Sequence, residues 1–210
     1  EYVCEGDLQE PDYSFNGLRV LKGEDGYYIG DDSGCSCPSP FENYAGKLTE
    51  TPLSDIPVDK LKLPKGFKVE VWAHGMPGVR MMARGSKGTV WAGTRIIGRV
   101  YEIKDKGGSR EHRILAQKLT QPNGVAYLGG SLYVAAINRV FRYQDIEDNP
   151  NVKPEELTAQ FKLPPEAHHN WKFIAFGPDS KLYVQVGSPC NVCEPGPEYG
   201  QIRRYTADGS

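Results

Sequence analysis

The segment from residue 166 to residue 172 carries side chains that can do acid–base chemistry. It reads Glu166-Ala-His168-His169-Asn-Trp171-Lys172, so two histidines stand beside an aromatic ring and an amine. Because the pKa of histidine lies near neutral pH, an imidazole at the mouth of a pocket can take a proton from a ligand as a general base. From spacing alone the alternative is a solvated surface loop, with Trp171 covering the core and Lys172 facing water.

Two groups of residues could ligate a metal, but neither has favourable spacing. Consecutive side chains of an extended segment point to opposite faces, so His168 and His169 make a poor chelate. The C-x-C at residues 35–37 and the C-x-x-C at residues 190–193 offer four thiolates, whereas structural zinc sites usually take two C-x2-4-C pairs. We assign no metal ligand and keep structural zinc as the alternative for the cysteines.

Disulfides are the better explanation for four of the five cysteines, since an odd number cannot all pair within the chain. The five are Cys4, Cys35, Cys37, Cys190 and Cys193. Glu194 rather than His follows the C-x-x-C and no βαβ pattern precedes it, which disfavours haem attachment and thioredoxin chemistry. We predict a loop disulfide between Cys190 and Cys193 and a bridge from Cys4 to Cys35 or Cys37. Disulfides and a start at Glu1 without Met or a signal region suit a mature extracytoplasmic chain, periplasmic or secreted.

Composition indicates many turns and short strands. The 210 residues include 24 Gly and 16 Pro, and 10% are aromatic, which favours strands over helices. The net charge of -2 gives no basic field for nucleic acid. The longest apolar run, at residues 132–137, is far shorter than the roughly 18 residues that a membrane helix needs, so we expect no membrane span.

Three segments repeat the pattern of strand, tight turn and strand. They begin at Val79, Gly124 and Phe173, and glycine-containing turns interrupt them at residues 85–88, 129–130 and 177–179. An aromatic residue recurs in the second strand, with spacings of 42 and 50 residues, at Trp91, Tyr133 and Tyr183. A third strand is predicted at residues 98–103, 138–143 and 200–205, and a fourth at residues 112–116 and 157–161.

Four strands in a period of about 40 to 50 residues are typical of a β-propeller blade. We therefore predict an all-β fold with about two and three-quarter blades, and a generic β-sandwich is the alternative. Residues 67–73 alternate as a half-buried outer strand of a neighbouring blade would, and residues 18–29, with their turn at 23–26, read as another hairpin. The predicted organisation is an irregular, cysteine-bearing segment at 1–60 and the N-terminal half of a propeller domain at 61–210.

In such a blade, the loop between the second and third strands lies on the same face as the loop that leads into the next blade. One face therefore gathers the loops at residues 74–80, 118–123 and 163–171 with those at 94–98 and 187–199. The polar candidates that should converge there are Arg80, Arg95, Asn123, His168, His169, Lys172 and the C-x-x-C loop.

Four stretches of the sequence resemble the soluble quinoprotein glucose and sorbosone dehydrogenases, closest to the sorbosone branch. They begin at Leu63-Pro-Lys-Gly-Phe, at Gln121-Pro-Asn-Gly, at His168-His169-Asn-Trp-Lys-Phe and at Gly187-Ser-Pro-Cys-Asn-Val-Cys, and the similarity runs from about residue 61 to residue 210. The resemblance implies a six-bladed propeller that uses pyrroloquinoline quinone, together with calcium.

The resemblance also implies roles for particular residues. His169, eight residues before Gly177, takes the place of the catalytic base, which removes a proton from a sugar or aldose hydroxyl while hydride passes to the quinone. Asn123 takes the place of a pocket-lining residue. The residues that we expect to contact the cofactor are Asn123, Arg80, Arg95, His168, Trp171 and Lys172. Pro122 and Asn170 depart from the glutamine and glycine usual in the family.

The remaining cofactor and calcium ligands of the family come after the region matched here, so we expect them beyond residue 210 and expect the chain to be part of a longer protein. The implied partners are a sugar or aldose substrate and an external electron acceptor. The alternative function is a non-catalytic propeller that serves as a scaffold or interaction subunit of a larger assembly, because propellers host many functions.

Overall fold

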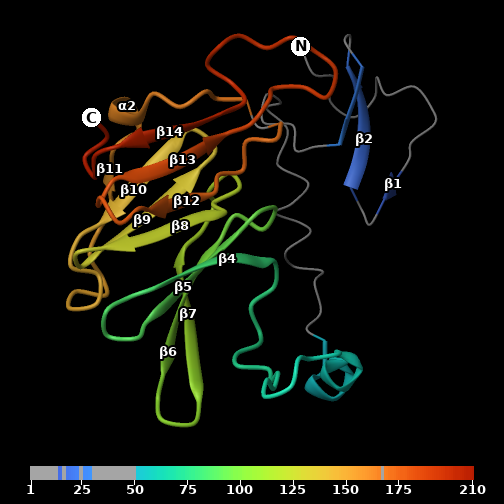
Figure 1. The fold of residues 1–210 in the computed structure, drawn as a ribbon, viewed down its shortest axis with the longest axis vertical. Coiled ribbons are helices and arrows are strands. Elements are labelled where there is room, and N and C mark those ends of the chain that lie inside the picture. The colour runs from blue at the N-terminus through green and yellow to red at the C-terminus, as the bar shows by residue number, and fades with distance from the viewer. Residues whose placement is uncertain (1–13, 16–17, 24–25, 30–50, 167) are drawn as a thin grey trace.

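The computed structural model describes residues 14–15, 18–23, 26–29, 51–166 and 168–210. The predicted bridge from Cys4 to Cys35 or Cys37 lies outside these residues. Within them, short antiparallel strands make up most of the regular structure (Figure 1).

The first blade is a four-stranded antiparallel sheet with its strands in sequence order. It consists of β4 (Val79–Arg84), β5 (Val90–Thr94), β6 (Val100–Asp105) and β7 (Arg110–Ala116). Gly88, with φ of +90°, adopts the left-handed conformation that the turn between β4 and β5 requires. The turn closes through a 2.7 Å hydrogen bond from the Gly85 amide to the Thr89 carbonyl.

The second blade repeats this meander with β8 (Gly124–Leu128), β9 (Ser131–Ala136), β10 (Arg139–Tyr143) and β11 (Glu155–Glu156). The two-residue turn between β8 and β9 is Gly129-Gly130, and both residues have positive φ, as a tight hairpin turn needs. The third blade contributes β12 (Ile174–Phe176), β13 (Leu182–Val186) and β14 (Gln201–Tyr205).

The first strands of the blades lie next to one another, because β8 contacts both β4 and β12. Aromatic pairs fill the two seams. Trp91 of the first blade stacks on Tyr127 of the second, with ring centroids 5.3 Å apart, and Tyr133 of the second meets Phe176 of the third edge-on at 5.1 Å. The predictions of an all-β fold and of propeller blades are confirmed.

The other described elements lie before the blades. β1 (Ser14–Phe15), β2 (Leu18–Gly23) and β3 (Gly26–Ile29) form a three-stranded sheet, and the pairing of β2 with β3 confirms the hairpin predicted at residues 18–29. Two single turns of 3₁₀ helix follow, η1 (Leu53–Asp55) and η2 (Val58–Lys60).

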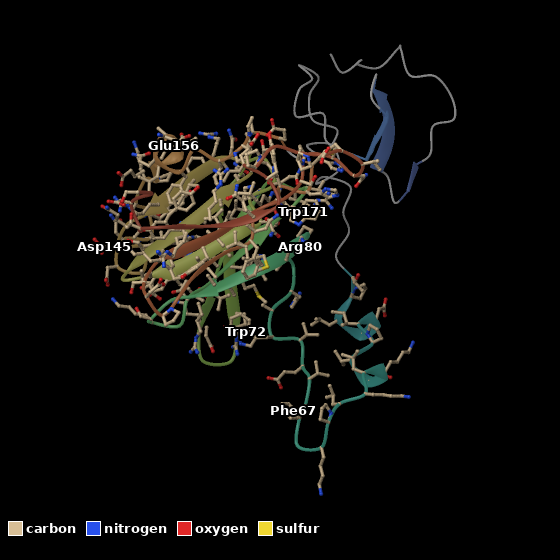
Figure 2. The ribbon with its side chains drawn as sticks, turned by 45° about the horizontal axis from the view of Figure 1, so that its top comes forward. Phe67, Trp72, Arg80, Asp145, Glu156 and Trp171 are labelled. Carbon is tan, nitrogen blue, oxygen red and sulfur yellow. A yellow bond between two sulfur atoms is a disulfide. The ribbon has the colours of Figure 1, made fainter. Side chains whose placement is uncertain are left out.

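Two strand predictions were wrong. Residues 67–73 form no strand, and Figure 2 shows Phe67 on a loop away from the sheets, 73% exposed. No strand in the described part of the chain pairs with this segment, and without a partner its alternating pattern cannot make a sheet. Residues 157–161 were predicted as a fourth strand, but the strand is only β11, and α2 (Thr158–Phe161) follows it. Leu157 and Phe161 are both buried and four residues apart, which fits one helical turn.

Candidate functional site

The loops that lead into the second and third blades meet beside the first strands. A Cβ atom on Gly93, at the end of β5, would lie 2.4 Å from the Pro122 carbonyl oxygen, so only glycine lets these backbones approach so closely. Asn123 is buried, and its Nδ2 donates a 2.8 Å hydrogen bond to the Lys172 carbonyl. The predicted convergence of the Asn123 and Lys172 loops is therefore present.

His169 occupies a constrained position in the loop before β12. Its φ is +53°, a left-handed conformation that is uncommon for a residue other than glycine. Gln185 Nε2 donates a 3.0 Å hydrogen bond to the His169 carbonyl. A Cβ atom on Gly187 would lie 2.0 Å from the same oxygen, so Gly187 leaves the space that His169 needs. The end of β13 thus fixes the backbone of His169.

Three further candidate side chains surround His169. The His168 and His169 ring centroids are 4.0 Å apart, and the Trp171 ring lies 6.5 Å from that of His169. The Arg95 guanidinium, from the loop after β5, lies 3.9 Å above the centre of the Trp171 ring, which is cation–π geometry. Loops of the first and third blades therefore build one partly exposed group of rings and cations.

Lys172 and Asn170 lie beneath this group and are fully buried. Lys172 Nζ donates a 2.6 Å hydrogen bond to Asn170 Oδ1, and the Gly187 amide donates to the same oxygen at 3.0 Å. Burial, with a smaller contribution from the Arg203 charge, lowers the pKa of Lys172 to about 8, while Glu166 acts in the opposite direction. The alternative in which Lys172 faces water is wrong.

The segment is also tied to the loop between β13 and β14. A hydrogen bond with Glu166 raises the pKa of Tyr199, which lies in that loop, to about 12. Cys190 and Cys193 form the predicted disulfide in this loop, with Cα atoms 5.9 Å apart, so they are not available as zinc thiolates. Ser188 Oγ donates a 2.9 Å hydrogen bond to the Cys190 carbonyl.

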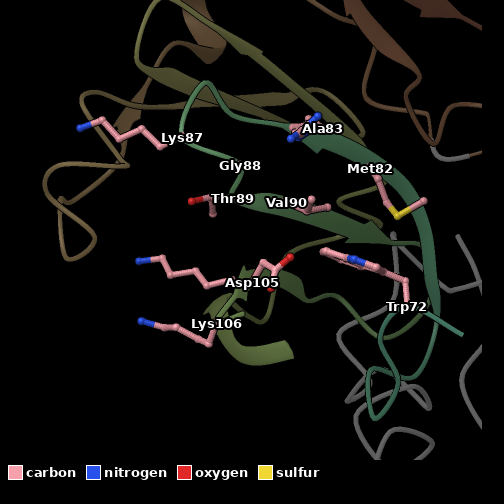
Figure 3. A pocket seen from close by; sticks show the side chains of 11 residues that line it. Trp72, Met82, Ala83, Lys87, Gly88, Thr89, Val90, Asp105 and Lys106 are labelled. Carbon is pink, nitrogen blue, oxygen red and sulfur yellow. The ribbon is translucent and has the colours of Figure 1, made fainter. Parts of the chain in front are cut away.

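Arg80 has no described contact with the group around His169. It is exposed on β4, and within the described residues its guanidinium forms no hydrogen bond, ion pair or ring contact. A pocket of about 710 Å³ opens elsewhere on the first blade, between Trp72 and Met82 on one side and the ammonium groups of Lys87 and Lys106 on the other (Figure 3). The candidate residues do not line this pocket.

Sequence reasoning missed three residues that hold the site, namely Asn170, Gln185 and Gly187. Two of them carried a signal. Gln185 is a polar residue inside an apolar strand, and Asn170 stands where the resemblance implies glycine. The role of Gly187 depends on how closely the His169 carbonyl approaches it, which no sequence pattern expresses.

The exposed part of the site fits a planar anionic cofactor such as pyrroloquinoline quinone. Beneath it, His168 Nε2 and Asn170 Nδ2 are buried polar atoms without a hydrogen-bond partner in the described part of the chain, and such atoms usually bond to a water molecule. Arg95 and Trp171 supply a cation and an aromatic face. For calcium, the described residues hold no cluster of three or more His, Cys, Asp or Glu side chains.

Parts of this chain are similar to known proteins. The model of a family described as a domain of unknown function (DUF7574) matches residues 1–72. No curated protein matches the chain. Among solved structures, the chain is similar to the PQQ-bound form of aldose sugar dehydrogenase from Streptomyces coelicolor, with 19% identity and a TM-score of 0.44. The match covers 64% of this chain and 46% of that one, so the chain spans about half the length of that structure.

None of the described helices is long and apolar enough to cross a membrane.

Proposed function

We propose that this protein is a quinoprotein oxidoreductase that oxidises a hydroxyl group of a sugar or aldose with pyrroloquinoline quinone. The observation that carries the proposal is the constrained backbone of His169, a partly exposed residue whose ring adjoins those of His168 and Trp171. A general base needs this combination of a fixed backbone and an accessible imidazole. The sequence resemblance assigns the same residue to proton removal.

The residues of the site divide into two roles. His169 accepts the proton of the substrate hydroxyl, and the ring of its neighbour His168 packs against it, with the ring centroids 4.0 Å apart. Arg95 and Trp171 hold the cofactor, since a guanidinium pairs with carboxylates and an aromatic ring stacks on a planar ring system. When bound, the quinone supplies the acceptor for a hydride, and an external electron acceptor must then remove the two electrons.

An extracytoplasmic location is part of the proposal. The Cys190–Cys193 disulfide supports it, because disulfides persist in oxidising compartments and are rare in the cytosol. We also propose that residues outside this sequence supply further ligands for the cofactor and for calcium. The substrate class is taken from the resemblance, and a panel of aldoses and polyols would define it.

The proposal is tested with the intact protein, pyrroloquinoline quinone and calcium, by measuring sugar-dependent reduction of a redox dye. We expect His169→Ala to lower kcat at least about a hundredfold, which is the usual contribution of a general base, while quinone binding persists. His112→Ala is the matched control, because His112 is exposed on β7, the outermost strand of the first blade. Quinone binding without dye reduction on any sugar, or full activity in His169→Ala, would refute the proposal and favour a non-catalytic propeller.

A further inference from the structure

A buried lysine lies directly behind the proposed base. Lys172 has no exposed surface, and in the described part of the chain no carboxylate contacts its amine, although the Glu166 charge acts on it from farther away. Lysine is almost never fully buried unless its amine has a partner. Its hydrogen-bond partner is the neutral Asn170 amide oxygen, so the amine points into the protein rather than to its surface.

The contacts of Lys172 join three segments. Its Nζ donates to Asn170 Oδ1 at 2.6 Å, and that oxygen also accepts from the Gly187 amide at 3.0 Å. Its carbonyl accepts from Asn123 Nδ2 at 2.8 Å. The loop before β12 is thereby connected to the end of β13 and to the start of β8. The bonds of Lys172 with Asn170 and Asn123 are buried, and the bond from Gly187 is partly buried.

The residue held between these contacts is His169. It precedes Asn170, it has a left-handed backbone, and its carbonyl accepts a hydrogen bond from Gln185. A residue other than glycine keeps this conformation only where its surroundings impose it. If Asn170 were released, Gly187 and His169 would lose their fixed spacing and the imidazole would lose its orientation.

We propose that Lys172 is a positioning residue, which acts through Asn170 to hold His169 in place and does not touch the cofactor or the substrate. As far as it concerns catalysis, this inference rests on the proposed function. The structural part of the inference does not rest on the proposed function, because the contacts between Lys172, Asn170 and Gly187 exist without any ligand.

The first test measures amide hydrogen exchange of the intact protein without a ligand. Lys172→Met keeps the length of the side chain and removes the amine. We expect faster exchange, roughly tenfold, in peptides that cover residues 168–172 and the Gly187 amide, with no change in β9. Lys181→Met is the control, because Lys181 lies in the same blade and its side chain forms no described hydrogen bond or ion pair. Unchanged exchange near Gly187 would overturn the inference whatever the enzyme does.

The second test separates positioning from ligand contact. In the quinone-loaded protein, Lys172→Met should lower kcat about tenfold and leave the quinone Kd and the sugar KM unchanged. The Asn170→Ala variant breaks the same contact from the other side, and it also serves if Lys172→Met does not fold. If Lys172 acts through Asn170, the double variant is no slower than Asn170→Ala alone. A raised quinone Kd with normal kcat would identify a cofactor contact and overturn the inference.

The two tests also distinguish this inference from the proposed function. Altered exchange at Gly187 in a protein that oxidises no sugar would support the positioning contact and refute the proposed function. Normal exchange at Gly187 in an active dehydrogenase would support the proposed function and refute the positioning contact.

Discussion

Burial of Lys172 should make the stability of this protein rise with pH in the alkaline range. Burial first, and the Arg203 charge second, lower the pKa of this amine from 10.5 to about 8. In the unfolded chain the amine stays protonated until about pH 10.5, so between these two pH values the unfolded state binds more protons than the folded state. At about 1.4 kcal/mol for each pH unit, the free energy of unfolding gains about 3 kcal/mol across this window.

The perturbation is Lys172→Met, which removes the titrating group. Urea unfolding followed by circular dichroism at pH 7, 8, 9 and 10 gives the free energy of unfolding of both proteins. The informative quantity is the difference between wild type and variant, because the titrations they share cancel. The lost hydrogen bond to Asn170 changes the offset of this difference but not its slope.

We expect wild type to gain on the variant from about pH 8 upward and to show a constant difference below that pH. Lys181→Met should follow the wild-type curve throughout. A flat difference, or one that falls with pH, would show that the buried amine keeps an ordinary pKa and would refute the reasoning from burial.

Three other perturbations test the packing. Gly187→Ala should lower the free energy of unfolding by about 1–3 kcal/mol, because its methyl group would meet the His169 carbonyl at 2.0 Å; a variant as stable as wild type in urea would contradict that close approach. Trp91→Ala should cost about 3–5 kcal/mol, since the ring is fully buried and stacked on Tyr127, and thermal melting that is unchanged would be the contrary result. Burial raises the pKa of Glu147, but hydrogen bonds from Ser86 and Tyr127 outweigh burial and leave this pKa below 4.5. Below about pH 4.5, acid should therefore lower the free energy of unfolding of wild type more than that of Glu147→Gln. Parallel curves of stability against pH would contradict this.

The blades could be predicted from the sequence because their signals are local. Alternating apolar residues, glycine turns and a recurring aromatic identify hairpins without knowledge of distant contacts. The errors arose where the pattern was ambiguous. Phe67 belongs to an alternating segment with no pairing partner in the described structure, and Leu157 with Phe161 satisfies both a strand-like and a helical spacing.

The site could be predicted only in outline, because topology brings loops together but does not decide which side chains face a ligand. Arg95, Trp171 and His169 do come together, as antiparallel alternation requires. Lys172 was predicted beside them as a ligand contact, yet its side chain runs inward to Asn170. Nothing in the run His-His-Asn-Trp-Lys distinguishes an inward from an outward lysine, since that choice depends on the Asn170 and Gly187 contacts.

The recurring aromatic residues also show what local sequence patterns predict and what depends on contacts with distant residues. Trp91 and Tyr133 occupy equivalent positions in their blades, and each meets an aromatic ring in the first strand of the next blade. Tyr183 is the third member of this series, but its hydroxyl donates a 3.0 Å hydrogen bond to Asp179 Oδ2, and no ring of the described residues packs on it. The repeat therefore determines where each aromatic lies in its sheet, while the neighbouring sheet determines what that aromatic does. Because the His169 loop also lies at a seam, the chemistry of this site is likewise set by contacts between loops rather than by any one motif.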